Sequence, residues 1–288
     1  MLTSFLGVLF DGIASGCLLF LISVGLSVTM GMMNFLNLAH GAFAMLGGYL
    51  CLMAMTRYGA PFLATLPLAM AACGIVGALF ERLLFRPMYR AGHLNQVLLT
   101  FGLVLMSIAA ATFVWGPEQQ PIRLPPFLTG QVKAFGAEFG TYRLFLVALV
   151  VVLTLLMVFL VENTRFGAQV RAAVDNSQAS EGLGINVDRV FSVTFALGSA
   201  LAGLGGALGI DVLGLDPTFP LKYLVYFLLV VTVGGARGIK GPLLAALILG
   251  VFDIVGKYYV PEAGAFIIYA VMVALLLAFP SGLFGRRT

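Results

Sequence analysis

Residues 143–161 read RLFLVALVVVLTLLMVFLV, and beyond the first arginine this run contains only one polar residue, Thr154. A helix needs ~20 predominantly apolar residues to cross the hydrocarbon core of a membrane. Strands of a membrane barrel would instead alternate in polarity over ~10 residues. Eight further continuous apolar runs lie at 13–31, 41–56, 62–81, 95–115, 190–213, 221–235, 241–256 and 264–280. The sequence therefore predicts an all-α, polytopic membrane bundle over residues 1–288, a single domain of about eight or nine spans.

The overall composition supports this fold class. The chain is 61% hydrophobic and only 10% charged, whereas ordinary soluble domains are about 25% charged. A soluble globular fold is therefore excluded. The basic residues are scattered at the ends of the apolar runs, so the net charge of +4 is no sign of nucleic-acid binding. Cys17, Cys51 and Cys73 lie inside apolar runs and are predicted to be small buried hydrophobes.

Glycine is frequent within the apolar runs, with 35 residues in the chain. Two pairs have the spacing of helix contacts in lipid, Gly12-x-x-x-Gly16 and Gly205-x-x-x-Gly209. Small residues let helix backbones approach closely where apolar burial alone drives little association. The glycines therefore predict a tightly packed bundle.

Basic residues concentrate in four segments between the runs. Ten of the sixteen lie in 82–94, 162–189, 236–240 and 281–288. Cytoplasmic loops of membrane proteins carry an excess of lysine and arginine. These segments and the C-terminus are therefore predicted to be cytoplasmic. Nine crossings would then place the N-terminus outside, and a broken or re-entrant first pair of helices would change that count.

The largest predicted external segment is 116–142, whose proline and glycine content opposes regular helix. It is interpreted as a connecting loop. The alternative is that it helps to seat a substrate-delivering protein.

Polar residues interrupt the apolar sequence between the first two runs, where Asn34, Asn37 and His40 precede Gly41. Polar side chains are costly in hydrocarbon unless partnered, and broken helices often line transport sites. In the alternative interpretation, the two asparagines cap helix ends in a short cytoplasmic turn.

A second break contains Gly234, Gly235, Gly238 and Gly241 and follows a short apolar run. A short span that ends in glycines is typical of a discontinuous helix. The simpler interpretation is a cytoplasmic turn anchored by basic residues.

Asp253 is the acid that lies furthest inside an apolar run. An acid at such a position is a candidate for function. Lys257 follows four residues later, however, and structural pairing across one helical turn is the favoured interpretation.

The most polar stretch of the chain is 163–190. Residues 168–179 have good helix propensity, and Gly182 and Gly184 end this segment. A short amphiphilic helix can dock in a groove of a soluble partner. A plain solvated loop is the alternative.

The sequence contains no recognisable catalytic motif. It lacks a His-Glu-x-x-His zinc site, a Gly-x-Ser-x-Gly elbow and a phosphate-binding loop. If the protein uses ATP, a partner must bind it.

Three motifs resemble the permease subunits of branched-chain amino-acid ATP-binding-cassette importers. They are Thr164-Arg-Phe-Gly167 with Leu183-Gly-Ile-Asn-Val-Asp-Arg189, Asn37-Leu-Ala-His-Gly41 with Met45-Leu-Gly-Gly-Tyr49, and Gly234-Gly235 with Gly238-Ile-Lys-Gly241. Many relatives carry an acid where this chain has Ala42, and often a serine where it has Gly238. Both departures leave the identity of the cargo open.

The resemblance implies an importer subunit that is not itself an enzyme, placed in a bacterial inner membrane with its C-terminus in the cytoplasm. Its partners would be a second homologous permease, two cytoplasmic ATPase subunits that hold ATP and Mg, a periplasmic solute-binding protein and membrane lipid, with no nucleic acid. Branched-chain or related hydrophobic amino acids would be the cargo. Urea, amides or aromatic acids are alternative cargoes, and an ion-coupled secondary transporter is the rival class.

The resemblance also assigns roles to three sets of residues. Those that would couple the chain to the ATPases are Arg165, Arg171, Asn176, Glu181, Gly184, Asn186, Asp188 and Arg189. Those near the substrate path or its gate would be Asn34, Asn37, His40 and Gly41. Gly234, Gly235, Gly238 and Gly241 would allow the helix break to repack.

Overall fold

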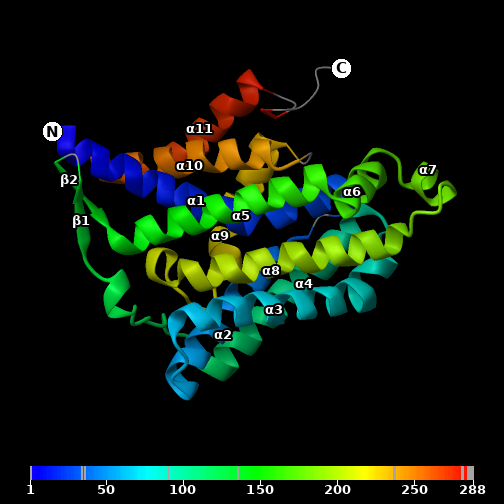
Figure 1. The fold of residues 1–288 in the computed structure, drawn as a ribbon, viewed down its shortest axis with the longest axis horizontal. Helices are drawn as coiled ribbons and strands as arrows, with labels where there is room; N and C mark the ends of the chain where they lie inside the picture. The colour runs from blue at the N-terminus through cyan, green and yellow to red at the C-terminus, as the bar shows by residue number, and fades with distance from the viewer. Residues whose placement is uncertain are drawn as a thin grey trace.

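The computed structural model describes residues 2–33, 35, 37–89, 91–134, 136–235, 238–279 and 282–283. Nine apolar helices form the bundle, and each coincides with one predicted run (Figure 1). They are α1 (Leu2–Met33), α2 (His40–Tyr58), α3 (Phe62–Phe80), α4 (His93–Trp115), α5 (Thr141–Asn163), α8 (Val187–Leu213), α9 (Phe219–Gly234), α10 (Lys240–Tyr259) and α11 (Gly264–Ala278). Two short helices, α6 (Arg165–Asp175) and α7 (Ser177–Gly182), lie between α5 and α8.

Six helical segments in the described part of the chain are long and apolar enough to cross a membrane. They are α1, α4, α5, α8, α10 and a segment made of α3 with the turns that follow it. The apolar parts of α9 and α11 are shorter than a full span. The prediction of a helical bundle with broken or short helices is thus confirmed, and the span count remains approximate.

The helix α8 is the centre of the bundle, and α1, α2 and α3 pack around it. Glycines set the closeness of these contacts. A Cβ on Gly25 of α1 would lie 2.5 Å from the Gly198 Cα of α8, and one on Gly47 of α2 would lie 2.4 Å from the Gly203 Cα. In the same way, a Cβ on Gly16 would lie 2.7 Å from the Ala246 carbonyl of α10. The predicted tight packing is confirmed.

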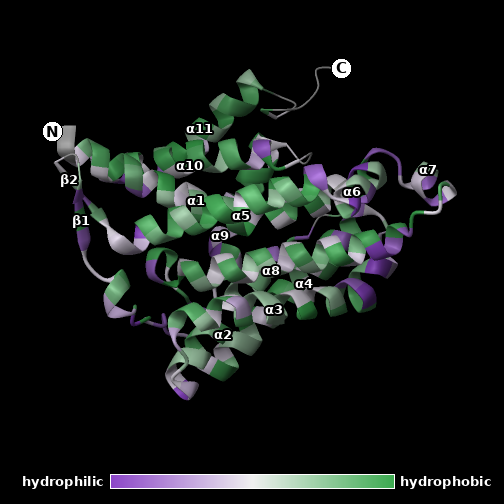
Figure 2. Cartoon of the chain, viewed as in Figure 1, coloured by the Kyte–Doolittle hydropathy of each residue, from purple (hydrophilic) through white to green (hydrophobic). Residues whose placement is uncertain are grey.

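Charged segments far apart in sequence meet at one end of the bundle (Figures 1 and 2). Arg86 pairs with Asp188 across this end, at 3.5 Å, and Lys240 pairs with Glu162, at 3.6 Å. The backbone amide of Leu283 donates to the Val233 carbonyl beside them. The described residues of all four basic segments predicted to be cytoplasmic therefore share this end, which we call the α6–α7 end.

The opposite end carries the segment 116–142, whose described residues contain no α-helix before α5 begins at Thr141, as predicted, but include a 3-10 turn at Pro126–Leu128. It forms a small antiparallel hairpin, β1 (Gln131–Ala134) and β2 (Ala137–Gly140), that the composition did not indicate. Phe139 of β2 packs edge-on against Phe10 of α1. The four-residue strands fold back on themselves against α1, so the bundle remains essentially all-α.

The end of α3 departs from regular α-helix. A π-helical turn, Glu81–Phe85, continues the helix and passes into a 3-10 turn, Arg86–Met88. Short π segments are rare and occur frequently at functional sites. This turn places Glu81 with no exposed surface against α8.

The glycine contacts yield a stability prediction. Gly25→Ala is expected to destabilise the protein by about 1–3 kcal/mol, because the added methyl group meets backbone that cannot move as a side chain does. Gly102→Ala on α4 is the matched control, since nothing lies within 4 Å of its Cβ position. Thermal unfolding in detergent, followed by size-exclusion chromatography, measures both. Equal midpoints for the two variants would contradict the assigned role of the contact.

Candidate functional site

Polar side chains cap the first turns of α6, α7 and α8, and so mark the boundaries of the helix pair α6–α7. The Thr164 hydroxyl accepts a hydrogen bond from the Gly167 amide at the start of α6. The Asn176 side chain accepts from the Ala179 amide at the start of α7, and Asn186 accepts from the Arg189 amide at the start of α8. Such caps satisfy amides that the first turn leaves free. Asn176 and Asn186, predicted as coupling residues, therefore fix the helix boundaries of this segment.

The helix α6 is held tightly to the end of α5. A Cβ on Gly167 would lie 2.2 Å from the Val161 carbonyl oxygen, so only glycine fits there. Val170 and Ala173 are buried on the same face of α6. The Arg171 guanidinium donates to the Val161 carbonyl as well. These contacts join α6 to the last turn of α5.

The tip of this segment is exposed. Leu183 is 82% exposed directly after α7, and the Glu181 side chain is also exposed. Gly184 has a positive φ of 84°, which bends the chain back toward α8. Arg165 and Arg189 are exposed in the first turns of α6 and α8. An isolated, solvated leucine between charged residues is suited to insertion into a groove of a soluble partner.

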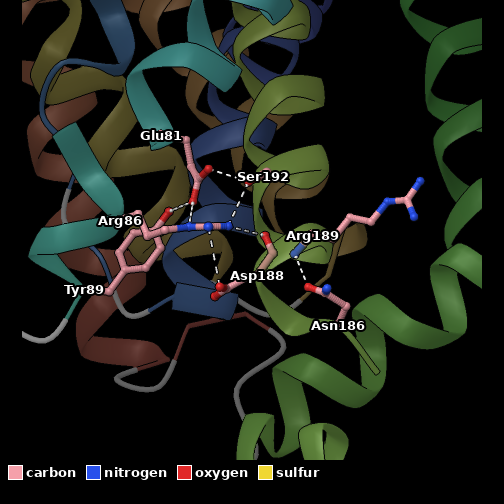
Figure 3. A network of polar contacts seen from close by, with 7 residues as sticks. All are labelled: Glu81, Arg86, Tyr89, Asn186, Asp188, Arg189 and Ser192. Carbon is pink, nitrogen blue, oxygen red and sulfur yellow. Dashed lines mark hydrogen bonds and ion pairs between the residues drawn. The ribbon is translucent and has the colours of Figure 1, made fainter. Parts of the chain in front are cut away.

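A network of polar contacts fastens this segment to α3 (Figure 3). The Glu81 carboxylate accepts hydrogen bonds from the Ser192 hydroxyl of α8 and, at 3.0 Å, from the Tyr89 hydroxyl. Arg86 Nε lies 3.5 Å from Glu81, and Arg86 also donates to the Asp188 carbonyl at 3.1 Å. The network joins the π-helical turn to the first turn of α8, directly after the α6–α7 segment.

Charge balance explains how a fully buried carboxylate is tolerated. Arg86 bridges Glu81 and Asp188, and its own side chain is 37% exposed. Burial and the neighbouring Glu81 carboxylate raise the pKa of the Tyr89 phenol. Tyr89 therefore remains a protonated donor at neutral pH. In Figure 3, the Arg189 side chain points away from the network.

Sequence reasoning missed Glu81. It was the last residue of an apolar run, and Arg86 was counted only as a basic flank. Two features of the sequence could have indicated this site: an acid at the end of an apolar run, and an arginine five residues after it. The two residues meet because the intervening turn is π-helical rather than α-helical.

The first helix break contains an unusual buried amide. Asn37 is 1% exposed, and within the described residues neither its amide nitrogen nor its amide oxygen has a hydrogen-bond partner. The residue that precedes α2 is Ala39, and no side chain caps the helix. The capping interpretation of Asn37 is therefore not observed. Asn34 lies outside the described residues.

The other two residues predicted for this break have structural contacts. His40 is 2% exposed, and its Nε2 lies 2.8 Å from the Ile22 carbonyl oxygen of α1. Gly41 lies against α9, where its Cβ would be 3.1 Å from the Pro220 Cα. Asn37, His40 and Gly41 thus lie where α1, α2 and α9 meet.

The second break lies between the end of α9 at Gly234 and the start of α10 at Lys240. Gly235 and Gly238 have positive φ values of 83° and 94°. A Cβ on Gly241 would lie 2.0 Å from the Gly234 carbonyl oxygen, so the two helix ends touch. The Ser27 hydroxyl of α1 donates to the Gly235 carbonyl at 3.2 Å. The glycines therefore join three helices at the α6–α7 end.

The buried acid Asp253 is paired, as predicted. Lys257 Nζ donates to its carboxylate at 2.6 Å, one helical turn away. The described residues contain no group of three or more potential metal-ligating side chains.

Several long apolar helices in one chain, with polar breaks inside the bundle, define a multi-pass membrane protein with the architecture of a transporter. Residues 8–276 match the family model described as "Branched-chain amino acid transport system / permease component". The chain belongs to this family, and it is a permease subunit of an importer rather than an enzyme.

Curated relatives align along nearly the whole chain. The chain is 27% identical to the high-affinity branched-chain amino acid transport system permease protein LivH of Escherichia coli, over 98% of this chain and 96% of that protein. It is 26% identical to BraD of Pseudomonas aeruginosa, over 96% and 95%. A probable LivH of Methanocaldococcus jannaschii is 28% identical, over 93% and 89%. No solved structure matches the chain.

The buried network yields a second prediction. Arg86→Ala is expected to destabilise the protein by about 1–3 kcal/mol, because it leaves the Glu81 carboxylate buried without its cation. Arg82→Ala is the control, since Arg82 belongs to the same turn and is exposed. Thermal unfolding in detergent compares the two. A midpoint for Arg86→Ala equal to that of the control would show that the network contributes no stability.

Proposed function

We propose that this chain is the permease subunit of an ATP-driven importer and that α6–α7 is the element that docks on a cytoplasmic ATPase. The observation that carries the proposal is the exposed tip at Leu183 on a helix pair capped at each boundary. The chain itself has no phosphate-binding loop, so ATP and Mg are assigned to the partner subunits. A displacement of α6 by the ATPase would reach α5 through Gly167 and α3 through Glu81 and Arg86.

The α6–α7 end is assigned to the cytoplasm of a bacterial inner membrane. Six of the basic residues that the structure describes lie at this end, as expected for cytoplasmic loops: Arg82, Arg86, Arg165, Arg171, Arg189 and Lys240. At the opposite end, four of the basic residues pair with acids: Lys133 with Glu138, Arg143 with Asp11, Lys222 with Asp216 and Lys257 with Asp253. The described C-terminal residues lie at the α6–α7 end, so the C-terminus is proposed to be cytoplasmic.

The remaining partners follow from the proposed assembly. A second, homologous permease would complete the path, and two ATPases would dock beneath the pair. The hairpin end, with β1 and β2, would face a periplasmic solute-binding protein. The helices α4 and α5, whose apolar windows are only 17% and 11% buried in the single chain, offer faces to lipid or to the second permease.

The proposed cargo is a branched-chain amino acid, as the names of the relatives state for those proteins. The residue proposed to meet the cargo or its gate is Asn37, whose buried amide has no partner in the described structure. Buried amides are nearly always hydrogen-bonded. A bound occupant or another conformation of the chain would satisfy the Asn37 amide.

An ion-coupled transporter working alone is disfavoured by the state of its best candidate site. Asp253 already has a cationic partner in Lys257, and the Tyr226 hydroxyl lies 3.5 Å from the same carboxylate. An ion site built on this acid would have to displace the lysine.

The decisive test is uptake into proteoliposomes that hold the permease pair, the ATPases and the solute-binding protein. Leucine uptake is expected to require ATP inside the proteoliposomes and every one of these protein components. Uptake by the purified chain alone, driven by an ion gradient without ATPase subunits, would overturn the proposal.

Substitution at the tip tests the docking role. Leu183→Asp and Glu181→Arg are expected to lower ATP-dependent uptake by about tenfold, because truncated or reversed anchor contacts cost ~2 kcal/mol or more. Glu118→Arg, an exposed acid at the end that faces away from the ATPases, is the matched control for ATPase binding, which it is expected to leave unchanged. Uptake and ATP hydrolysis are measured on the same preparation. Wild-type ratios of uptake to hydrolysis in both tip variants would refute docking through α7.

Substitutions in the first helix break distinguish a residue of the substrate path from a residue that only stabilises the fold. Asn37→Ala is expected to change uptake without loss of stability, because no hydrogen bond is removed. His40→Ala is expected to lower the unfolding free energy by about 1 kcal/mol, because the contact with the Ile22 carbonyl is lost. Thermal midpoints and uptake rates are compared for both. Unchanged uptake in Asn37→Ala would remove this residue from the path.

A further inference from the structure

A cavity of about 400 Å³ opens at the α6–α7 end, between α1, α5, α6 and the α9–α10 turn. Its volume lies within the range of small-molecule sites, ~300–1,000 Å³. Most of its apolar lining is aliphatic, with no aromatic side chain among the described lining residues. The aliphatic residues are Val28, Val158, Val161, Val170, Val174 and Ile239.

The charged part of the lining is balanced. Two acids, Glu162 and Asp175, and two bases, Arg171 and Lys240, border the same cavity. Glu162 and Lys240 are 3.6 Å apart and both more than half exposed, so water or a ligand can compete for their contact. An anionic headgroup or a nucleotide would require a surplus of cations, whereas this lining suits a neutral molecule with separated charges.

The helix ends that meet here have complementary polarity. The first residues of α10, Lys240 and Gly241, line the cavity, and no side chain caps this helix. The last turn of α5 contributes Glu162, and that of α6 contributes Asp175. A helix N-terminus favours an anion and a C-terminus favours a cation. Lys240 at the start of α10 and Glu162 at the end of α5 therefore lie next to each other, which suits the adjacent carboxylate and ammonium groups of one amino acid.

We infer that this cavity binds a zwitterionic, aliphatic amino acid from the α6–α7 side, and that the bound molecule resists movement of α6. The carboxylate would contact Lys240 and Arg171, the ammonium group Glu162 and Asp175, and the side chain the valines. A molecule held between α6 and the α9–α10 turn stabilises that one arrangement of the coupling element. A ligand shifts a conformational equilibrium only by its difference in affinity for the two states.

This inference rests on the proposed function, because it requires that the same amino acid is the cargo and that it accumulates at the α6–α7 end. The cavity then makes the accumulated product an inhibitor of its own import.

Binding is tested on the assembled permease and ATPase complex in nanodiscs, without the solute-binding protein. Radiolabelled leucine is the probe, with isovalerate and isoamylamine as competitors that each lack one charge. Wild type is expected to bind leucine saturably, and each competitor is expected to be weaker by about tenfold or more, the equivalent of ~1.4 kcal/mol. Isovalerate competing as well as leucine would overturn the zwitterion assignment, and so would the absence of saturable leucine binding.

Paired variants on α5 locate the binding. Val158→Trp fills the cavity and is expected to weaken leucine binding by more than about tenfold. Val152→Trp, on the same helix at a 61% exposed position, is expected to bind as wild type does. Glu162→Gln, which changes no volume, is expected to weaken binding of leucine but not of isovalerate, and it decides the matter if Val158→Trp does not fold. Wild-type leucine affinity in Val158→Trp, or in Glu162→Gln, would overturn the site.

Uptake by the complete importer separates the two proposals. Leucine loaded inside the proteoliposomes is expected to slow the initial rate of leucine uptake for wild type and Val152→Trp. For Val158→Trp, the initial rate of uptake is expected to be the same with and without internal leucine. Normal ATP-driven uptake with no effect of internal leucine would refute the inhibition alone. Saturable binding without ATP-driven uptake of any amino acid would refute the importer function instead.

Discussion

Close contact between helix backbones is the constraint on which this structure depends. In lipid, apolar side chains gain little by leaving their surroundings for one another, so association relies on packing and on internal hydrogen bonds. At Gly25 with Gly198 and at Gly47 with Gly203, any side chain would collide with backbone. Because Gly25 and Gly47 bring the backbones of α1 and α2 against α8, these three helices cannot shift past one another without separating those contacts.

The α6–α7 end combines closely packed helices with ionic and hydrogen-bonded contacts between them. The helix α6 is joined to α5 by a glycine contact and to α8 through capped turns, so it is rigid in itself. The Glu81 and Arg86 network then connects α8 to α3 by ionic and hydrogen-bonded contacts, which are directional and can be exchanged. Helices that are joined by exchangeable polar contacts can move relative to one another without deforming the core.

Much of the fold could be predicted because lipid imposes a simple pattern on the sequence. The nine apolar runs became helices, and the pairing of Asp253 with Lys257 followed from their spacing alone. The capping roles of Asn176 and Asn186 could not be separated from partner contact, since both uses favour asparagine. Glu81 was missed because its partner Ser192 and the Asp188 partner of Arg86 lie more than 100 residues away, and only tertiary packing brings them together. The cavity beside α6 was missed for the same reason.

The π-helical turn at Glu81–Phe85 has a geometric consequence for the helices on either side of it. It accommodates one residue more per hydrogen-bonded ring than an α-helix does. Each residue of an α-helix advances the chain by about 100° of rotation. If this turn were rewound into α-helix, everything after Phe85 would rotate by roughly that amount about the axis of α3. Arg86 would then face away from Asp188. A change of winding in these five residues would therefore make or break the contact between Arg86 and Asp188, while the body of α3 stays packed on α8.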